Sequence, residues 1–285
     1  MTREQSPVVV DTHTHVVSPD RSRFPLQTPD FPAEWVRESP VAVDGLLAAL
    51  DAGGVAGAVL VQAAGAYGFD NSYIAEARPV EPSRLVNAAV IDMAAPEREA
   101  VLRHWCGERG VLGLRLFNIP PSNPDWLGDP AALGVLRIAA ELGVRLSICV
   151  LEPDIPRIAG LLAGAPDQQI AIDHCGFVDL SDGLQSPSAA ALLSLSAYGN
   201  VRLKVTRTML GMAEEAGHAP ADIVEWLSEN FGVHRLMWGS DYPQHHSEPY
   251  PEIVDHGRRA CARLSASEQA RFLSGTALEL WPELS

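Results

Sequence analysis

The stretch PVVVDTHTHV, residues 7–16 of this 285-residue chain, gives the first indication of the fold. Its apolar, β-branched part, residues 7–12, is typical of a strand buried on both faces, as strands are in parallel sheets. It leads directly into His13 and His15, which are separated by one residue. Because alternate side chains of a strand point to the same face, these two imidazoles should project together from the carboxyl end of the strand.

Further short runs rich in valine, isoleucine and leucine predict seven more buried strands, with helix-like stretches between them. The expected strands cover residues 7–12, 55–62, 85–91, 111–117, 144–150, 169–173, 200–205 and 235–238. The expected helices cover residues 44–53, 96–109, 129–142, 154–162, 188–196, 219–230, 251–263 and 265–280.

Eight alternations of strand and helix are the pattern of a (β/α)8 TIM barrel of the α/β class. A barrel of this length forms a single domain, here residues 1–285. The alternative is a doubly wound open sheet, which usually has fewer strands and often a glycine-rich phosphate turn after the first strand. Here the first strand runs into DTHTHV instead, so the barrel is favoured.

Charge and cysteine content restrict the partners and the compartment. The formal net charge of −15 argues against nucleic acid and anionic membranes, which require a basic face, but not against a small anionic substrate. The four cysteines form no CxxC pair, which is typical of a reduced compartment. The amino terminus is too polar for a signal peptide, and no apolar run reaches transmembrane length. We therefore expect a cytoplasmic protein, and the sequence is compatible with a homo-oligomer.

The stretch 17–40 differs from the rest in being rich in proline, serine, arginine and aspartate. It carries Phe24, Phe31 and Trp35 and would form a long loop between the first strand and the first helix. Loops of this length at the catalytic face of a barrel are often lids. A surface excursion with aromatic anchors is the alternative interpretation.

Two other strands also end in residues with catalytic potential. His174 follows the sixth strand, and Asp241 follows the eighth in the segment 238–243, WGSDYP. Taken singly, each has an ordinary explanation, a structural histidine and a turn-capping aspartate. Because active sites of barrels lie at the carboxyl ends of the strands, the set of His13, His15, His174 and Asp241 predicts one catalytic cluster. Such a cluster can bind a metal, polarise a carbonyl group or activate water.

With these motifs the chain resembles the amidohydrolase superfamily, and within it the amidohydrolase-2 family. The shared segments are DTHTHV at 11–16, VQ with GFDNSY within 61–73, GLRLF at 113–117, IDHCG at 172–176 and WGSDYP at 238–243. Within this family the chain is most similar to lactonases that open pyrone-dicarboxylate, sugar and muconolactone rings. The resemblance implies that His13, His15, His174 and Asp241 form the catalytic cluster, with Asp241 as the general base toward water.

The chain departs from the family pattern at two places. Many members have a histidine ligand at the end of the fifth strand, where this chain has Cys149, and the fourth strand offers Arg115 instead of a bridging lysine or glutamate. A two-metal site is therefore disfavoured. One divalent metal, zinc above all, held by His13, His15, His174 and Asp241, remains compatible with the sequence, as does a site without metal. Cys149 would be either a thiolate ligand or an inert buried cysteine.

The second departure is Gln244, at a position where the family often has a histidine. Either His245 or His246 would then take over that role, or both belong to a solvated loop.

Several cations in the expected strands point to a carboxylated substrate. Arg115 and Lys204 lie within apolar strands, and Arg207 lies just beyond the seventh strand. A buried charge must be paired or face a polar centre, so each of these would hold a substrate carboxylate or pair with a core carboxylate. The core candidates are Asp11, Asp92 and Asp173. The side chains of Asn71 and Tyr73, in the loop after the second strand, would hydrogen-bond a ligand or only order the loop.

The expected function is hydrolysis of a carboxylated lactone, with water activated by Asp241. The second hypothesis is a non-oxidative decarboxylase acting on a small, aromatic carboxylic acid with a mononuclear metal. Those enzymes usually keep the histidine of the fifth strand, which is absent here. The third hypothesis is a barrel that binds a ligand without catalysis, which would have no need of a base.

Overall fold

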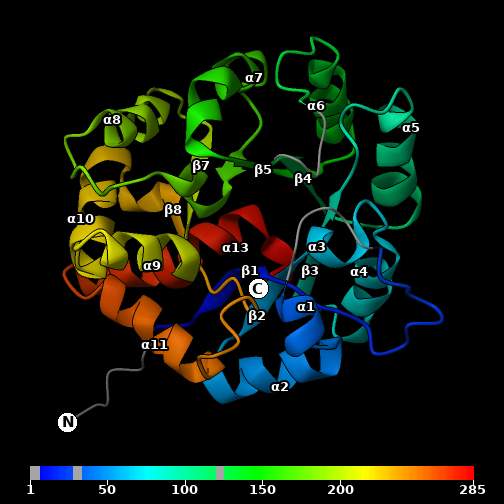
Figure 1. Cartoon of the computed structure of the whole chain (residues 1–285), viewed down its shortest axis with the longest axis horizontal. Helices are drawn as coiled ribbons and strands as arrows, with labels where there is room; N and C mark the ends of the chain where they lie inside the picture. Colours follow the sequence, from blue (N-terminus) through cyan, green and yellow to red (C-terminus); the bar gives the residue numbers. More distant parts are fainter. Residues whose placement is uncertain (1–6, 28–33, 120–124) are drawn as a thin grey trace.

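Eight parallel strands follow one another in chain order around a barrel in the computed structural model, which describes residues 7–27, 34–119 and 125–285 (Figure 1). Each strand pairs in parallel with the next, from β1 to β8, and β1 and β8 lie side by side. This order confirms the single-domain TIM barrel. The strands are β1 (Val10–Thr14), β2 (Gly57–Val61), β3 (Leu85–Val90), β4 (Gly113–Asn118), β5 (Arg145–Val150), β6 (Ile170–Ile172), β7 (Val201–Thr206) and β8 (Leu236–Gly239).

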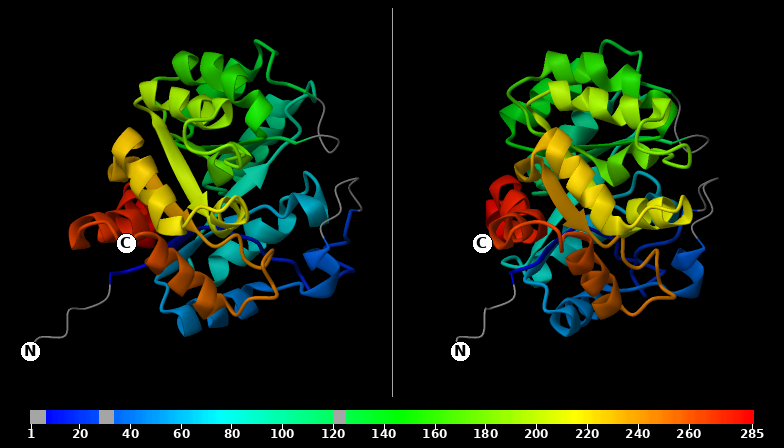
Figure 2. Two further views of the ribbon diagram at one scale, coloured as in Figure 1. Left: turned by 60° about the vertical axis from the view of Figure 1, so that its left-hand side comes forward. Right: turned by 90° about the vertical axis from the view of Figure 1, so that its left-hand side faces the viewer.

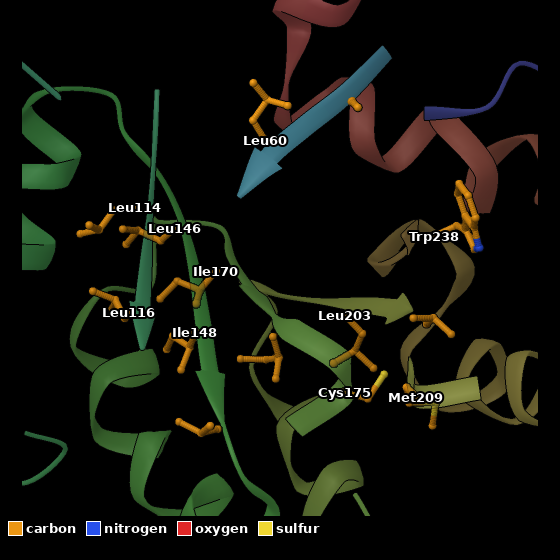
Figure 3. Packing of buried hydrophobic residues seen from close by; sticks show 14 of the residues in the cluster. Leu60, Leu114, Leu116, Leu146, Ile148, Ile170, Cys175, Leu203, Met209 and Trp238 are labelled. Atoms are coloured by element: carbon orange, nitrogen blue, oxygen red, sulfur yellow. The ribbon is translucent and has the colours of Figure 1, made fainter. Parts of the chain in front are cut away.

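Helices surround the barrel and bury one face of each strand. Leu60, Leu114, Ile148 and Leu203 belong to the hydrophobic layer that also contains the apolar faces of these helices (Figure 3). Because both faces of a parallel sheet are covered, its strands are apolar throughout. The helices are α1 (Trp35–Glu38), α2 (Val43–Gly53), α3 (Ala64–Tyr67), α4 (Ser72–Ala77), α5 (Arg98–Leu102), α6 (Ala132–Glu141), α7 (Ala159–Gly164), α8 (Pro187–Ser194), α9 (Arg207–Glu215), α10 (Pro220–Phe231), α11 (Tyr250–Ala260), α12 (Ala266–Ala270) and α13 (Thr276–Leu280).

The amino ends of the strands are closed by the carboxyl-terminal segment. Trp281 and Leu284 pack into a second hydrophobic cluster with Val59 and Val86 of the barrel interior. A Cβ atom at Gly113 would lie 2.5 Å from the Trp281 ring, so only glycine fits there. Figure 2 shows the carboxyl-terminal helices at the end of the barrel where the strands begin. The opposite, carboxyl end of the barrel is thereby left for a site.

The joint between β1 and β8 depends on side chains and on the segments that follow the strands. The Thr12 hydroxyl donates to the Trp238 carbonyl at 2.7 Å, and the Asp241 N–H donates to the His13 carbonyl at 2.9 Å. The register of β1 against β2 shifts between Asp11 and Thr14, which indicates a bulge or irregularity there. The joint therefore brings the motif DTHTH directly against the segment that contains Asp241.

Several element boundaries differ from expectation. β1 begins at Val10 and not at residue 7, and it extends to Thr14. The helix expected at 96–109 is the short α5 followed by a π-helical turn, Arg103–Glu108, and the one expected at 265–280 is divided by the π-helical turn Arg271–Gly275. The helix expected at 154–162 starts as a 3-10 helix, Glu152–Ile158, because Pro153 and Pro156 cannot donate backbone hydrogen bonds.

Helix α9 was not expected from the sequence, and neither were the short helices α1, α3 and α4. The loop 17–40 contains α1, whereas its residues 28–33, Phe31 among them, lie outside the described residues, as do residues 1–6 at the amino terminus. The lid remains a prediction. Among the described residues, no helix is long and apolar enough to cross a membrane.

Candidate active site

Four side chains from β1, β6 and β8 meet at the carboxyl end of the barrel. The ring centroid of His13 lies 5.0 Å from that of His15 and 4.6 Å from that of His174. Asp241 Oδ1 lies 3.3 Å from His15 Nε2 and 3.7 Å from His13 Nε2, and its Oδ2 lies 3.9 Å from His174 Nδ1. All four side chains are buried. The structure thus brings together the four residues that the sequence placed at the ends of strands one, six and eight.

The backbone that presents this cluster is strained at two of the four residues. His174 and Asp241 have φ angles of 53° and 59°, in the left-handed region that residues other than glycine seldom adopt. Such strain costs about 1–3 kcal/mol per residue and persists only where the surroundings impose it. Beside Asp241, the buried Asp11 carboxylate accepts from the N–H groups of His13 and Ser240 and from the Tyr250 hydroxyl, which ties β1 to the segment after β8.

Hydrogen bonds fix the tautomers of two of the imidazoles. His15 Nδ1 lies 2.9 Å from the Val61 carbonyl, which can only accept, so His15 carries a proton on Nδ1 while its Nε2 faces Asp241. The Arg115 guanidinium can only donate, so His174 Nε2 accepts from it at 3.4 Å. His174 Nδ1 then donates to the Thr206 hydroxyl at 2.8 Å.

This geometry fits a metal ion held by three residues. The ligand atoms of His13, His15 and Asp241 all lie within 4.8 Å of one another, and both ring nitrogens of His13 are buried without a hydrogen-bond partner among the described residues. His15 Nε2 lies 3.3 Å from a carboxylate oxygen of Asp241, so a cation could be held by both atoms. A backbone carbonyl that holds the other nitrogen of a histidine is the usual outer support of a metal ligand. His174, whose two nitrogens are both hydrogen-bonded, is not part of this group.

Burial sets the charge of the imidazoles and of the cysteine at this end of the barrel. It lowers the pKa of His13 well below its usual range and that of His174 to about 4, so both rings are neutral near pH 7. It raises the pKa of the Cys149 thiol to about 12, against the opposing effect of Arg115. Cys149 is therefore a neutral thiol, and it accepts a hydrogen bond from Arg115 at 3.1 Å.

Asp241 remains ionised in spite of burial. Burial by itself raises the pKa of this carboxyl group, but the neighbouring His174 and His15 and a hydrogen bond from the Thr208 hydroxyl outweigh it. The pKa of Asp241 is consequently well below its usual range. A carboxylate that is buried, ionised and next to a cavity has the protonation state that a general base requires.

A buried ion-pair network lies beside the cluster. Arg115 Nε donates to Asp173 Oδ2 at 2.6 Å, and Lys204 Nζ lies 3.0 Å from Asp173 Oδ1. Burial raises the pKa of Asp173, but the two cations reverse this effect and hold the pKa below its usual value. Of the three core carboxylates considered as partners, Asp173 is thus the one that these cations contact.

A small cavity opens above the cluster and combines a polar part with apolar walls. Its polar residues are His15, Arg115, His174 and Asp241, and Gln244 lies at its border. Trp35 of α1 stacks on His15 with ring centroids 5.6 Å apart. The remaining lining residues are small or apolar, namely Ala63, Ala64, Gly65, Phe117, Ile119 and Phe177. Arg115 thus contributes a cation to a cavity with aromatic walls, whereas Lys204 lies beneath it.

The other expected substrate-binding side chains lie outside the lining of this cavity. The Arg207 guanidinium pairs with Glu248 at 2.8 Å and with Glu214 at 3.3 Å. The Tyr73 hydroxyl accepts from the Val43 N–H. The Asn71 side chain bonds to backbone groups at three points, with Val90 N–H, Val90 carbonyl and Phe69 carbonyl as its partners.

Two contacts near Asp241 were not foreseen. Thr208, the second residue of α9, donates its hydroxyl proton to Asp241 Oδ2 and lies 2.9 Å from His245 Nε2. His246, the other histidine of this pair, points elsewhere and lies 3.4 Å from a Glu38 carboxylate oxygen. In the sequence, the position of Thr208 just after the expected seventh strand was the available signal, since sites in barrels are built at the carboxyl ends of the strands.

Together these features define a TIM-barrel protein whose histidine–aspartate site lies at the carboxyl ends of its strands. Residues 10–282 match the model of the amidohydrolase family, and the chain belongs to this amidohydrolase-2 family. It is therefore an amidohydrolase-type hydrolase.

Individual relatives agree with this assignment. The chain is 24% identical over 201 residues to an L-fucono-1,5-lactonase of Burkholderia ambifaria, over 67% of this chain and 68% of that protein. A candidate 2-pyrone-4,6-dicarboxylic acid hydrolase from Pseudomonas putida is 28% identical, with a TM-score of 0.77 over 97% of this chain and 98% of that one. An amidohydrolase from Burkholderia multivorans with bound zinc shares the fold at 22% identity, with a TM-score of 0.71 over 96% and 99% of the two chains.

Proposed function

We propose that this protein hydrolyses a small lactone that carries a carboxylate group. The observation that carries the proposal is the combination of the ionised Asp241 with the Arg115 cation at a single cavity with aromatic walls. A base beside a cation suits a substrate in which a reactive ring carbonyl and a carboxylate lie a few ångströms apart. The likeness to an L-fucono-1,5-lactonase and to a candidate pyrone-dicarboxylic acid hydrolase supports the same substrate class.

In the proposed reaction Asp241 takes a proton from a water molecule, whose oxygen attacks the ring carbonyl carbon. The bond between this carbon and the ring oxygen then breaks, and Asp241 returns the proton to the departing alkoxide. The product is a hydroxy acid, which ionises and releases one proton for each ring opened. His15 donates its Nδ1 proton to Val61, so its Nε2 would be available as a metal ligand.

Arg115 would hold the substrate carboxylate in this cavity. Its Nε donates to Asp173 and its Nη2 to Cys149 and His174, so a substrate carboxylate would accept from Nη1. Phe117 packs against the guanidinium with 5.1 Å between the Arg115 Cζ atom and the ring centroid. Asp173 holds the Nε side of the same group. A carboxylate bound here would be oriented with its ring toward Asp241, which lowers the entropic part of the barrier.

We also propose that His13, His15 and Asp241 hold one divalent metal ion, zinc being the best match for this donor set. Bound there, the ion would supply Lewis-acid stabilisation of the charge that develops on the carbonyl oxygen. The zinc in the relative from Burkholderia multivorans supports this part of the proposal. His174 would then act as a neutral neighbour of Arg115 and not as a ligand.

A screen of carboxylated lactones and aromatic carboxylic acids, read by release of acid and of carbon dioxide, tests the proposed function. Release of one proton per lactone, with formation of the hydroxy acid, supports the lactonase. Release of carbon dioxide from an acid would replace it with the decarboxylase. Binding of a ligand without turnover of any compound would leave a non-catalytic barrel.

Asp241→Asn should abolish turnover while the protein remains folded, because the amide cannot accept a proton from water. We expect kcat to fall by a factor of about 100 to 10,000, the usual contribution of a general base. Initial rates in a pH-stat measure this, and circular dichroism checks the fold. Asp182→Asn, at an exposed carboxylate, is the matched control and should keep the wild-type rate. Retained activity in Asp241→Asn would remove the proposed base.

Metal content tests the ligand set separately. Elemental analysis of gently purified, tag-free protein should find about one divalent ion per chain. His15→Asn should lose most of it, because the amide is a much weaker ligand than an imidazole, whereas His246→Asn should keep it. Chelation should remove activity together with the ion. Full activity in a sample without bound metal would contradict the proposed metal and leave Asp241 as the base.

A further inference from the structure

A chain of two hydrogen bonds leads from Asp241 to the loop after β8. The Thr208 hydroxyl contacts Asp241 Oδ2 on one side and His245 Nε2, at 2.9 Å, on the other. Thr208 lies at the start of α9, directly after β7, and His245 lies four residues beyond Asp241. Two neighbouring strands thus contribute through the segments that follow them.

The directions of both hydrogen bonds follow from the chemistry of the three groups. Threonine has one hydroxyl proton, and an ionised carboxylate can only accept, so Thr208 donates to Asp241. The oxygen of Thr208 is then the acceptor for the second bond, and His245 must donate its Nε2 proton to it. Burial lowers the pKa of His245, which agrees with a neutral ring that carries its proton on Nε2.

The local fold does not by itself explain the contact between Thr208 and His245. The amino-terminal cap of α9 is Thr206, whose hydroxyl accepts from the Met209 N–H, so the hydroxyl of Thr208 has no part in the capping of the helix. The charged groups around His245 are occupied with one another: Arg207 pairs with Glu248 and Glu214, and Glu214 also pairs with His256.

We propose that Thr208 and His245 are positioning residues for Asp241, an inference that rests on the proposed role of Asp241 as the base. Thr208 holds Oδ2, so that Oδ1 stays directed toward His13 and His15. His245 acts one step further out, because its N–H keeps the Thr208 proton pointed at the carboxylate. A functional side chain keeps a productive orientation only where neighbouring hydrogen bonds hold it, and Thr208 supplies such a bond to Asp241.

Kinetics of two Thr208 variants separate positioning from mere folding. Thr208→Val keeps the shape and removes the donor, and we expect kcat to fall about 10- to 100-fold, the loss typical of a misplaced reacting group. KM should change by less than about threefold, because Thr208 does not line the cavity. Thr208→Ser keeps the hydroxyl and should restore most of kcat. A normal kcat in Thr208→Val, or an equal loss in Thr208→Ser, would overturn the proposal.

A double-mutant cycle tests whether His245 acts through Thr208. His245→Phe should lower kcat about fivefold, as expected for one lost hydrogen bond, but should have no further effect in the Thr208→Val background. His246→Phe is the matched control, since this histidine contacts Glu38 instead. Additive losses in the double variant would exclude the chain.

A readout without turnover keeps this inference separate from the proposed function. In protein with ¹⁵N-labelled histidine, the ring resonances of His245, assigned by their absence in His245→Phe, should show the Nε2–H tautomer. Thr208→Val should shift them toward the Nδ1–H form, because the acceptor is lost. A His245 tautomer that is unchanged in Thr208→Val contradicts the chain. The kinetic measurements use whichever substrate the wild type converts, so a protein that releases carbon dioxide would refute the lactonase and still test Thr208 and His245.

Discussion

Single hydrogen bonds decide what each imidazole of the site can do. The Val61 carbonyl binds the Nδ1 proton of His15 and leaves its Nε2 directed at Asp241, and Arg115 makes His174 an acceptor. His13 has no such partner among the described residues, and its two nitrogens are buried. The three histidines are therefore chemically different although each follows a buried strand. Two of them suit a metal ion, and the third belongs to the hydrogen-bond network of the cation that would bind substrate.

Arg115→Gln should separate recognition of the substrate carboxylate from catalysis. Without the guanidinium, KM for a carboxylated lactone should rise about 10- to 100-fold, which corresponds to about 1.4–2.7 kcal/mol of lost binding. KM for a lactone of the same ring without the carboxylate should change little. Steady-state kinetics on this pair of substrates gives the comparison.

The control for this prediction is Arg207→Gln, because the Arg207 guanidinium pairs with two glutamates outside the cavity lining. Lys204 still pairs with Asp173 when Arg115 is replaced, so the variant should fold, as thermal unfolding will show. An equal rise of KM for both lactones would mean that Arg115 supports the structure of the cavity and not the carboxylate.

At the level of elements, the strands were predictable because continuous apolar runs mark strands that are covered on both faces. The helices were less predictable from the sequence. The segment Arg98–Glu108 contains no residue that forces a change of helix type after Leu102, so its π-helical turn depends on packing that the sequence does not display. Helix α9 was missed because it begins one residue after β7, with no intervening turn.

The same limit applies to the site. The meeting of His13, His15, His174 and Asp241 was predictable because each lies near or beyond the carboxyl end of a strand, and all these ends face one side of a parallel barrel. Contacts between side chains of different elements were not predictable from the sequence. Three carboxylates were equally good partners for Arg115 on sequence grounds. Only the folded barrel, in which β6 pairs with β7 and lies one strand away from β4, brings both cations to Asp173. The contact of Thr208 with Asp241 likewise requires knowing how α9 approaches the segment after β8.

For the molecule as a whole, the net charge does not describe the charge beside the cavity. The chain carries a formal charge of −15, yet the buried groups beside the cavity, Arg115, Lys204, Asp173 and Asp241, balance one another. The proposed anionic substrate would interact with the nearby Arg115 cation, where apolar walls reduce screening, and less with the distant negative surface. A negative protein with a carboxylated substrate is thus physically consistent.

The buried imidazoles also make the stability of the whole barrel depend on pH. In the unfolded chain a histidine has a pKa of about 6.5, whereas burial lowers that of His174 to about 4 and that of His13 well below its usual range. Above pH 6.5 both states hold these rings neutral, and their contribution does not change. As the pH falls below 6.5, the unfolded chain binds protons that the folded chain does not, so the free energy of unfolding decreases.

Each such imidazole should lower the free energy of unfolding by about 1.4 kcal/mol per pH unit below 6.5. Asp11 has the opposite effect on the free energy of unfolding. Burial raises its pKa to about 6, so between pH 6 and 4 the folded chain binds a proton that the unfolded chain does not. The two histidines outweigh one carboxyl group, so stability should fall between pH 6.5 and 5. Urea unfolding of metal-free protein at pH 7.5, 6.5 and 5.5 measures this, and His174→Gln should show a shallower decrease than the wild type. A free energy of unfolding that stays constant or rises on acidification would mean that the rings are charged in the folded protein. The metal site and the Arg115 contact both require neutral His13 and His174, so that outcome would contradict them.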